Sequence, residues 1–186
     1  ELTDVNKEKA AQIIETALKQ SPVRPLWLDA LSVIGLLDCY GIRVVKTESA
    51  ATADEAAKAA EEIGFPVAVK LLSATIAHKT EVGGVVLDLN SAREVKQAFS
   101  EIRDRLAGIG KQAEMQGVTV QKMVTDGIEV IVGVSRDPSL GPIIMFGIGG
   151  IYAELFKDVA FRIHPLTDVD ARELVRSVKA RQLLEG

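Results

Sequence analysis

The stretch PVAVKLLSATIAHKTEVGGVVLDL, residues 66–89, sets the expected fold of this chain. Its two ends, 66–72 and 85–89, are rich in valine and leucine and read as strands, and Pro66 stands at the first strand position, where no ladder donor is needed. A polar loop that contains glycine joins the two ends and carries His78, one of two histidines in the chain. The stretch therefore predicts two strands joined by a loop that presents an imidazole.

Further elements are predicted on both sides of this stretch. Helical periodicity and capping boxes predict helices at 4–20, about 26–40, 52–64, 91–107, a short one at 152–157, and one from about 168. Strand patterns predict strands at 43–46, 118–124, 128–134, 142–148 and 159–163. Because hairpins outnumber parallel crossovers in this order, the chain is predicted to be an α+β protein with mostly antiparallel sheets.

Length and composition limit the classes of function. The chain has 186 residues, 47% hydrophobic and 26% charged, with a net charge of −4, which is typical of one globular domain or two small lobes. It has 4% aromatics and no basic stripe, so nucleic acid is not expected as a partner. Cys39 is the single cysteine and no apolar run reaches membrane-spanning length, which fits a reducing cytoplasm and no membrane. The start at Glu1 instead of Met suggests a fragment of a longer polypeptide.

Two interpretations of the loop remain open on local sequence alone. A loop of this kind can direct backbone N–H groups at a phosphate chain, with Lys70 and Lys79 neutralising charge and Gly83 and Gly84 allowing close approach. Neutral His78 has a nitrogen lone pair that can accept a phosphoryl group. The alternative is an exposed turn with an incidental histidine.

A second cluster follows in VQKMVTDGIEVIVGV, residues 120–134. Gln121, Met123 and Val124 lie where two predicted strands meet at a turn, and Glu129 follows on the next strand. An apolar slot at a strand end can receive a purine, and a nearby carboxylate can bind ribose hydroxyls. The alternative is an ordinary β-hairpin with alternating faces.

A third cluster contains Glu154 and Asp158, which are four residues apart on the predicted short helix. At this spacing the two carboxylates share a helix face and could bind magnesium, or pair with Lys157 and Arg162 instead. His164 precedes a proline in an apolar strand and is interpreted as structural.

The segments taken together are far more specific than any one of them. They run in order as FPVAVK (65–70), HKTEVGGV (78–85), VQKMV (120–124), VGVSRDP (132–138), GPIIMFG (141–147) and AFRI (160–163). This series resembles the ATP-grasp domain of the ADP-forming (NDP-forming) acyl-CoA synthetases, which include acetate–CoA ligase and are relatives of succinyl-CoA synthetase. The resemblance covers about residues 24–166. It implies a linker helix at 1–23, an N-terminal ATP-grasp lobe at 24–117 and an incomplete C-terminal lobe at 118–186, with the nucleotide between the lobes.

The resemblance also implies an activity, that of an acid–thiol ligase: acyl-CoA + ADP + phosphate ⇌ carboxylate + ATP + CoA, with Mg²⁺. In the family, the histidine at the position of His78 receives a phosphoryl group from a histidine of the CoA-binding part and passes it to ADP. CoA-binding and ligase domains, on the same polypeptide or a partner subunit, are the implied partners. The implied nucleotide-binding residues are Lys70, His78, Lys79, Thr80, Gly83, Gly84, Gln121, Met123, Val124 and Glu129, with Glu154 and Asp158 for the metal.

Departures from the family pattern qualify this assignment. Thr75 and Glu81 stand where the family usually has aspartate, while His78 and Lys79 are in place. The family's C-terminal acidic-Asn-Pro-Leu segment, which supplies magnesium ligands, has no counterpart before Gly186, so the fragment alone is expected to be inactive. A rival function is a ligand-sensing regulatory ATP-grasp domain of a protein acetyltransferase, and a retained phosphoryl acceptor favours catalysis. The acyl group, the choice of ADP or GDP and the oligomeric state are left open.

Overall fold

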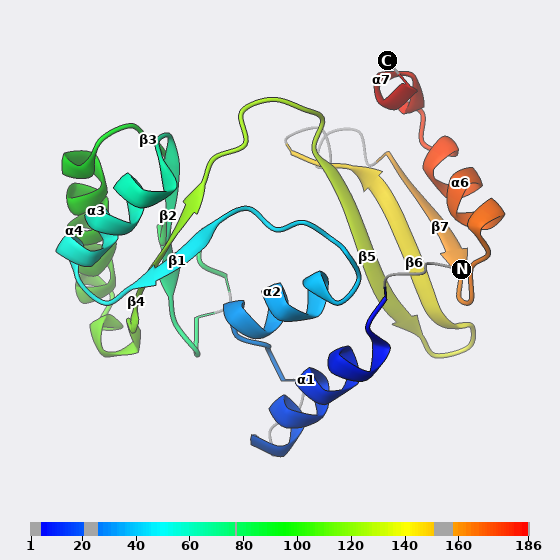
Figure 1. Ribbon diagram of the computed structural model, residues 1–186, viewed down its shortest axis with the longest axis horizontal. Coiled ribbons are helices and arrows are strands. Elements are labelled where there is room, and N and C mark those ends of the chain that lie inside the picture. The colour runs from blue at the N-terminus through cyan, green and yellow to red at the C-terminus, as the bar shows by residue number, and fades with distance from the viewer. Residues whose placement is uncertain (1–4, 21–25, 77, 151–157, 186) are drawn as a thin grey trace. The chain divides into compact units, whose positions relative to one another are not determined.

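The structure is a computed structural model that describes residues 5–20, 26–76, 78–150 and 158–185. It divides into two compact units, Glu1–Met123 and Val124–Gly186. Both units combine helices with antiparallel sheets, so the predicted α+β class is confirmed (Figure 1). Among the described residues, no helix is long and apolar enough to cross a membrane.

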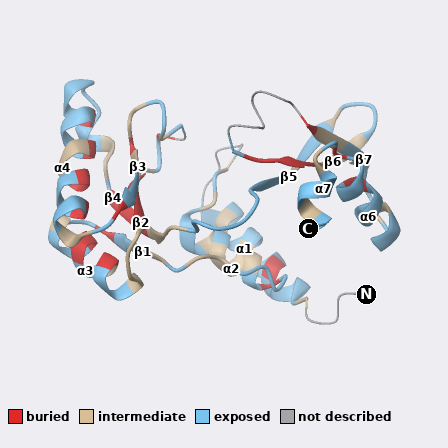
Figure 2. Ribbon diagram, turned by 90° about the horizontal axis from the view of Figure 1, so that it is seen from above, coloured by how far each residue is buried: buried red, intermediate tan, exposed pale blue. Residues whose placement is uncertain are grey.

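The first unit is built on a four-stranded antiparallel sheet with the strand order β1-β4-β2-β3. The helices α3 and α4 pack on one face of this sheet, and their buried residues join those of the strands in one core (Figure 2). Val67, Val69 and Leu71 of β2 are fully buried in that core, as are Val118 and Val120 of β4. The elements are β1 (Thr47–Ala50), α3 (Ala53–Ile63), β2 (Val67–Leu72), β3 (Val85–Leu89), α4 (Ala92–Gly108), the short 3₁₀ helix η1 (Gln112–Glu114) and β4 (Gly117–Lys122).

Strict alternation along β2 and β4 gives the sheet two different faces. Paired residues on neighbouring strands share a face, and Val69 pairs with Val120 while Lys70 pairs with Thr119. The valines therefore face the helices, whereas Lys70 and Thr119 share the opposite face with Gln121, two positions along β4. This opposite face carries the polar side chains that the site requires.

The predicted capping sequences begin the helices of the first unit. The Thr52 hydroxyl accepts the N–H of Glu55 at 3.2 Å, and the Glu55 carboxylate accepts the N–H of Ala51 at 2.8 Å. The same pair of bonds forms at Ser91 and Glu94, at the start of α4. Each glutamate accepts from the residue before the cap instead of the cap itself, while the cap hydroxyl satisfies one free N–H donor of the first helical turn.

One expectation about this unit is corrected by strand pairing. The strand predicted at 43–46 is wrong, because β1 begins at Thr47, which pairs with Gln121 near the end of β4. Residues before Thr47 therefore have almost no ladder partner. β4 pairs with both β1 and β2 and lies in the first unit, which ends at Met123, while the lobe boundary expected between residues 117 and 118 stays a prediction.

The N-terminal part of the first unit is a pair of helices. They are α1 (Lys7–Gln20), which matches the helix predicted at 4–20, and α2 (Ala30–Asp38), which begins at the N-cap Asp29. The Asp29 carboxylate accepts the N–H of Ser32 at 3.0 Å and its hydroxyl at 2.5 Å, and these two bonds lower the pKa of Asp29. The chain then turns at Gly41, which has a φ of +66°.

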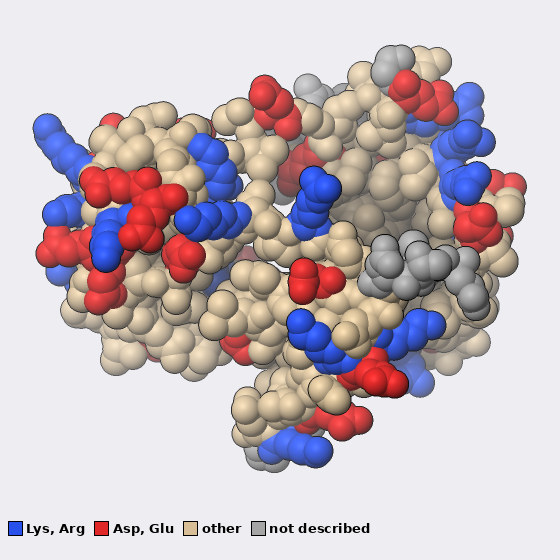
Figure 3. Space-filling view, in the orientation of Figure 1, with Lys and Arg blue, Asp and Glu red and all other residues tan. Residues whose placement is uncertain are grey.

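Charged side chains of both signs are mixed on the visible face of the molecule (Figure 3). One pair joins two helices that pack on the first sheet: the Lys96 ammonium of α4 lies 2.6 Å from the Asp54 carboxylate of α3. This hydrogen bond lowers the pKa of Asp54 and raises the pKa of Lys96. Because both side chains are exposed, the pair adds little to stability.

The second unit is a three-stranded antiparallel sheet with the strand order β5-β6-β7. Phe146 and Ile148 of this sheet are buried against Leu174 and Val178, which come from the C-terminal helical segment. The short helix predicted at 152–157 lies outside the described residues. The elements are β5 (Val130–Asp137), β6 (Gly141–Ile148), β7 (Val159–Ile163), α6 (Asp168–Arg176) and α7 (Arg181–Glu185).

A glycine at the start of β4 offers a test of the strand pairing. Gly117 has a φ of +138°, and a Cβ there would meet the carbonyl oxygen of Ala50 on β1. Gly110 has a φ of +71° with nothing within 4 Å of an added Cβ, so Gly110→Ala should cost only the backbone strain, about 1 kcal/mol. Gly117→Ala adds a backbone collision and should lower the free energy of unfolding by about 2 kcal/mol or more. Urea unfolding of both variants measures this, and equal losses would contradict it.

Candidate functional site

His78 lies in the loop that joins β2 to β3 and is presented to solvent. Its side chain is 82% exposed, and its Nδ1 lies 3.8 Å from the Glu81 carboxylate, three residues further on. Lys79, the next residue, is half-buried, and Thr80 is exposed. The imidazole can therefore be reached by a ligand, while Lys79 beside it is less exposed.

The Gly83–Gly84 pair closes this loop. The Gly83 N–H donates to the Thr80 carbonyl at 3.0 Å, and the Gly84 N–H donates to the Lys79 carbonyl at 2.7 Å. A Cβ at buried Gly84 would lie 2.9 Å from both the Leu71 Cβ and the Lys79 carbonyl oxygen, so only glycine fits there. The sequence suggested that these N–H groups approach a phosphate, but in this structure both already have acceptors within the loop. Their assignment to nucleotide binding stays a prediction.

The polar face of the first sheet brings together residues that are far apart in the sequence. The Lys70 ammonium donates to the Gln121 side-chain oxygen at 2.6 Å, and the Gln121 amide donates to the Thr47 hydroxyl at 3.1 Å. Burial, and then the nearby charge of Lys70, lower the pKa of Lys79. Two ammonium groups that oppose each other in this way favour an anion beside them, because it would offset their repulsion. Thr47 was missed, and nothing in its local sequence indicates this contact.

The two residues that follow β4 end the first unit and begin the second. Met123 is half-buried, and its N–H donates to the Pro66 carbonyl at 3.1 Å, which fixes its backbone beside the start of β2. The Val124 side chain is 68% exposed. Their role in lining an adenine pocket stays a prediction.

In the second unit, Glu129 lies over a glycine turn. The Gly149 N–H donates to the Glu129 carbonyl at 2.7 Å, and a Cβ at Gly149 would lie 2.7 Å from the Glu129 Cγ. A Cβ at Gly150, which has a φ of +65°, would lie 3.1 Å from a Glu129 carboxylate oxygen. The two glycines thus make room for the carboxylate.

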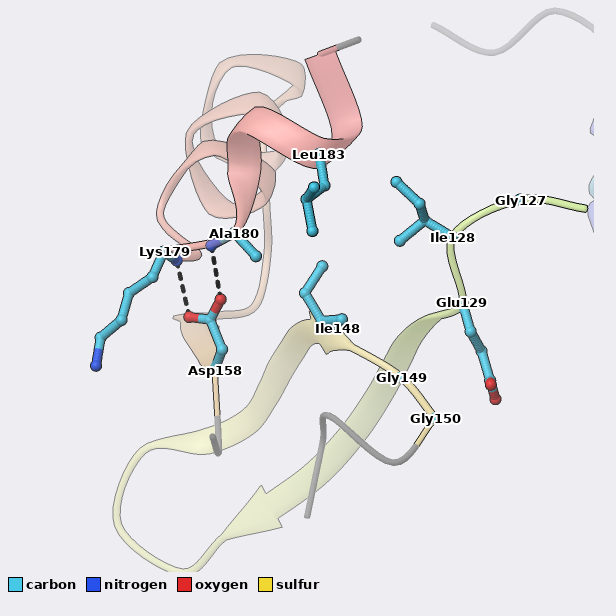
Figure 4. Close-up of a pocket in the computed structure, with 10 residues that line it drawn as sticks. All are labelled: Gly127, Ile128, Glu129, Ile148, Gly149, Gly150, Asp158, Lys179, Ala180 and Leu183. Carbon is cyan, nitrogen blue, oxygen red and sulfur yellow. Dashed lines mark hydrogen bonds between the residues drawn. The ribbon is translucent and has the colours of Figure 1, made fainter. Parts of the chain in front are cut away.

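A cavity of about 830 Å³ opens beside this turn, within the second unit. Ile128, Ile148 and Leu183 form its apolar wall and point toward one another, while the Glu129 carboxylate points away from them (Figure 4). The cavity therefore offers an apolar surface next to the turn.

Of the predicted magnesium pair, Asp158 alone lies in the described residues. Glu154 lies outside them, as does Lys157. Asp158 is buried, and its two oxygens accept the N–H groups of Lys179 and Ala180, each at 2.8 Å (Figure 4). Arg162 donates to the Ser177 hydroxyl at 3.3 Å. In the part of the chain that the structure describes, no group of three or more His, Cys, Asp or Glu could hold a metal ion, and the binding of magnesium by Glu154 and Asp158 stays a prediction.

Comparison with known proteins identifies the family. The ATP-grasp domain family matches residues 19–186, which is most of the chain. The chain belongs to the ATP-grasp family. The ATP-grasp fold expected from the sequence motifs is thereby confirmed.

Two curated relatives cover nearly the whole chain. Acetate–CoA ligase [ADP-forming] I of Archaeoglobus fulgidus is 46% identical over 98% of this chain and 26% of its own length. The beta subunit of acetate–CoA ligase [ADP-forming] II of Pyrococcus furiosus is 43% identical over 97% of this chain and 75% of its own length. The chain therefore spans about a quarter of the first relative and three quarters of the second.

Solved structures of one archaeal enzyme show the same fold. Dinucleotide-forming acetyl-coenzyme A synthetase 1 of Ca. Korarchaeum cryptofilum, in complex with coenzyme A, Ca-AMPCP and HgCl+, matches with a TM-score of 0.83 and 37% identity, over 95% of this chain and 76% of that one. Its complex with coenzyme A and Mg-AMPPCP has a phosphohistidine segment pointing towards the nucleotide binding site. That structure matches with a TM-score of 0.72 and 36% identity, over 95% of this chain and 74% of that one.

The pair of ammonium groups gives a testable titration. Since burial and Lys70 both disfavour the charged form, the Lys79 amine should react with an acylating reagent at a lower pH than a free lysine amine. Lys70→Met should raise the pKa of Lys79 part of the way back, because burial remains. Lys58→Met is the matched control, because Lys58 is an exposed residue of α3, and it should leave the pKa of Lys79 unchanged. Labelling followed by mass spectrometry across pH measures this; an unmoved midpoint in Lys70→Met refutes the coupling.

Proposed function

We propose that this chain is the nucleotide-binding, phosphoryl-transferring domain of an ADP-forming acyl-CoA synthetase, with His78 as the phosphoryl carrier. The proposed overall reaction is acyl-CoA + ADP + phosphate ⇌ carboxylate + ATP + CoA. The observation that carries the proposal is the exposed imidazole of His78 beside Lys79, whose ammonium group is coupled to that of Lys70. The relatives, which are ADP-forming acetate–CoA ligases, support the same activity.

The chemistry requires a nucleophile that both accepts and releases a phosphoryl group. A neutral nitrogen of His78 attacks the phosphorus of an incoming phosphoryl donor, forming a P–N bond as the bond to the donor breaks. An oxygen of the ADP β-phosphate then attacks the same phosphorus, and the P–N electron pair returns to the imidazole. Lys70 and Lys79 stabilise the negative charge on the phosphoryl oxygens during both steps.

The phosphoryl donor to His78 is proposed to come from a CoA-binding part that this chain does not itself contain. One relative is a chain about four times as long as the matched region, and the other is a beta subunit, so both fused and separate arrangements occur among the relatives. Residues 1–23 are proposed as the linker to that part, since α1 occupies most of them and the family match begins at residue 19. Residues 24–117 and 118–186 are proposed as the two ATP-grasp lobes, the second of them incomplete.

Phosphorylation in the reverse direction tests the proposal. The full-length protein, including the segments that this chain lacks, is incubated with γ-labelled ATP and Mg²⁺, and we expect acid-labile, base-stable label on His78. His78→Ala should abolish the label, because the variant has no imidazole to accept the phosphoryl group. His164→Ala, which removes the other, also exposed histidine, is the matched control and should be labelled normally.

Two outcomes of this experiment contradict the proposal. Label that persists in His78→Ala places the phosphoryl group elsewhere. Nucleotide binding by the wild type without any label favours the regulatory function, in which the domain senses a ligand and transfers nothing.

A further inference from the structure

The loop that carries His78 is held at both ends by side chains from outside it. At its start, the Thr75 hydroxyl donates to the carboxylate of Glu114 in η1. At its end, the Arg105 guanidinium of α4 donates to the Gly83 carbonyl at 2.8 Å. Glu114 and Arg105 lie far from the loop in sequence and belong to none of the motifs discussed above.

The start of the loop is fixed to the core of the first unit. The Ser73 hydroxyl accepts the N–H groups of Thr75 and Ile76 at 3.3 and 3.2 Å, and the Ile76 side chain is buried in the core. Glu114, the acceptor for Thr75, is itself held by Lys111, whose ammonium lies 3.8 Å from the second carboxylate oxygen. Thr75 is thus tied to a carboxylate that has a defined position.

The end of the loop is fixed to α4. Besides the Gly83 carbonyl, the Arg105 guanidinium donates to the Glu101 carboxylate at 3.1 Å. A Cβ at Gly83 would lie 2.9 Å from the Arg105 Cδ, so the arginine stem packs directly on the glycine. Neighbouring Leu106 and Ile102 are fully buried, which makes this stretch of α4 a rigid support.

Between these two ends the loop is tied to itself. The carbonyls of His78, Lys79 and Thr80 accept the N–H groups of Glu81, Gly84 and Gly83. Such a unit can move as one body, and its position depends on how its two ends are held.

We propose that Glu114 and Arg105 are positioning residues for phosphoryl transfer to His78. This inference rests on the proposed function. By fixing the two ends of the loop, the two side chains hold the imidazole and Lys79 at a set place relative to the bound nucleotide. Neither Glu114 nor Arg105 is itself assigned to the nucleotide, so loss of either side chain should slow transfer and leave nucleotide affinity nearly unchanged. A displacement of about 1 Å at a reacting group can cost up to roughly a hundredfold in rate.

Paired substitutions at each end test the proposal. Thr75→Val removes the hydroxyl and keeps the shape, while Thr75→Ser keeps the hydroxyl. Arg105→Met removes the guanidinium and keeps the stem, while Arg105→Lys keeps a donor for the Gly83 carbonyl. Arg103→Met is the control, since Arg103 is an exposed residue of the same helix that pairs with Asp104 instead of the loop.

The readout is the single-turnover rate of His78 phosphorylation by ATP, measured against ATP concentration. We expect Thr75→Val and Arg105→Met to lower the rate at saturating ATP by about tenfold or more, with half-saturation shifted by less than about twofold. Thr75→Ser and Arg105→Lys should recover most of the rate, and Arg103→Met should behave as the wild type. Hydrogen exchange at the Gly83 and Gly84 amides should accelerate in the two slow variants alone.

The outcomes distinguish failure of the proposed function from failure of the positioning role. If the wild type takes no label, the proposed function fails, and hydrogen exchange still reports whether the ends of the loop are held as described. If the wild type is labelled but Thr75→Val and Arg105→Met both keep the full rate, the positioning role is overturned. A higher half-saturation at an unchanged maximal rate also overturns it, because the two side chains would then act on binding.

Discussion

The pairing of β2 with β4 is the constraint on which the rest of the first unit depends. These strands are separated by a long stretch of chain, yet their register puts Lys70 opposite Thr119 and Ala68 opposite Gln121. The same register sets Val69 against Val120 on the helix-covered face. One ladder of backbone hydrogen bonds therefore assembles both the hydrophobic core and the polar surface on which an anion can bind.

Most of the fold could be predicted from local sequence, because local signals specify most of the elements. The capping residues Thr52 and Ser91 begin α3 and α4 as expected, and the strand predicted at 159–163 is observed with the same bounds. The prediction fails where pairing between distant segments determines which residues form a strand. Residues 43–46 have strand-like composition but almost no partner on β4, and β4 joins the first unit because its partners are there.

The candidate site likewise has a part that local sequence could predict and a part that it could not. The motif around His78 and its neighbouring lysines could be recognised in the sequence, because these residues are close together along the chain. The contacts of Thr47, Glu114 and Arg105 could not, since each depends on a segment brought near by folding. The packing of Glu129 on its glycine turn was likewise hidden, because isolated glycines in a sequence do not indicate what lies against them.

The two-faced sheet has a consequence for how this domain can change. A single-residue insertion or deletion within β2 would exchange its faces, placing the Lys70 ammonium among the valines of the core and a valine beside Gln121. Such a shift would disrupt the hydrophobic core and would also remove Lys70 from the polar face. Stability and anion binding would therefore be lost together. Variation in the length of the chain is therefore confined to the connecting segments, and the strands themselves can vary only by exchange of side chains.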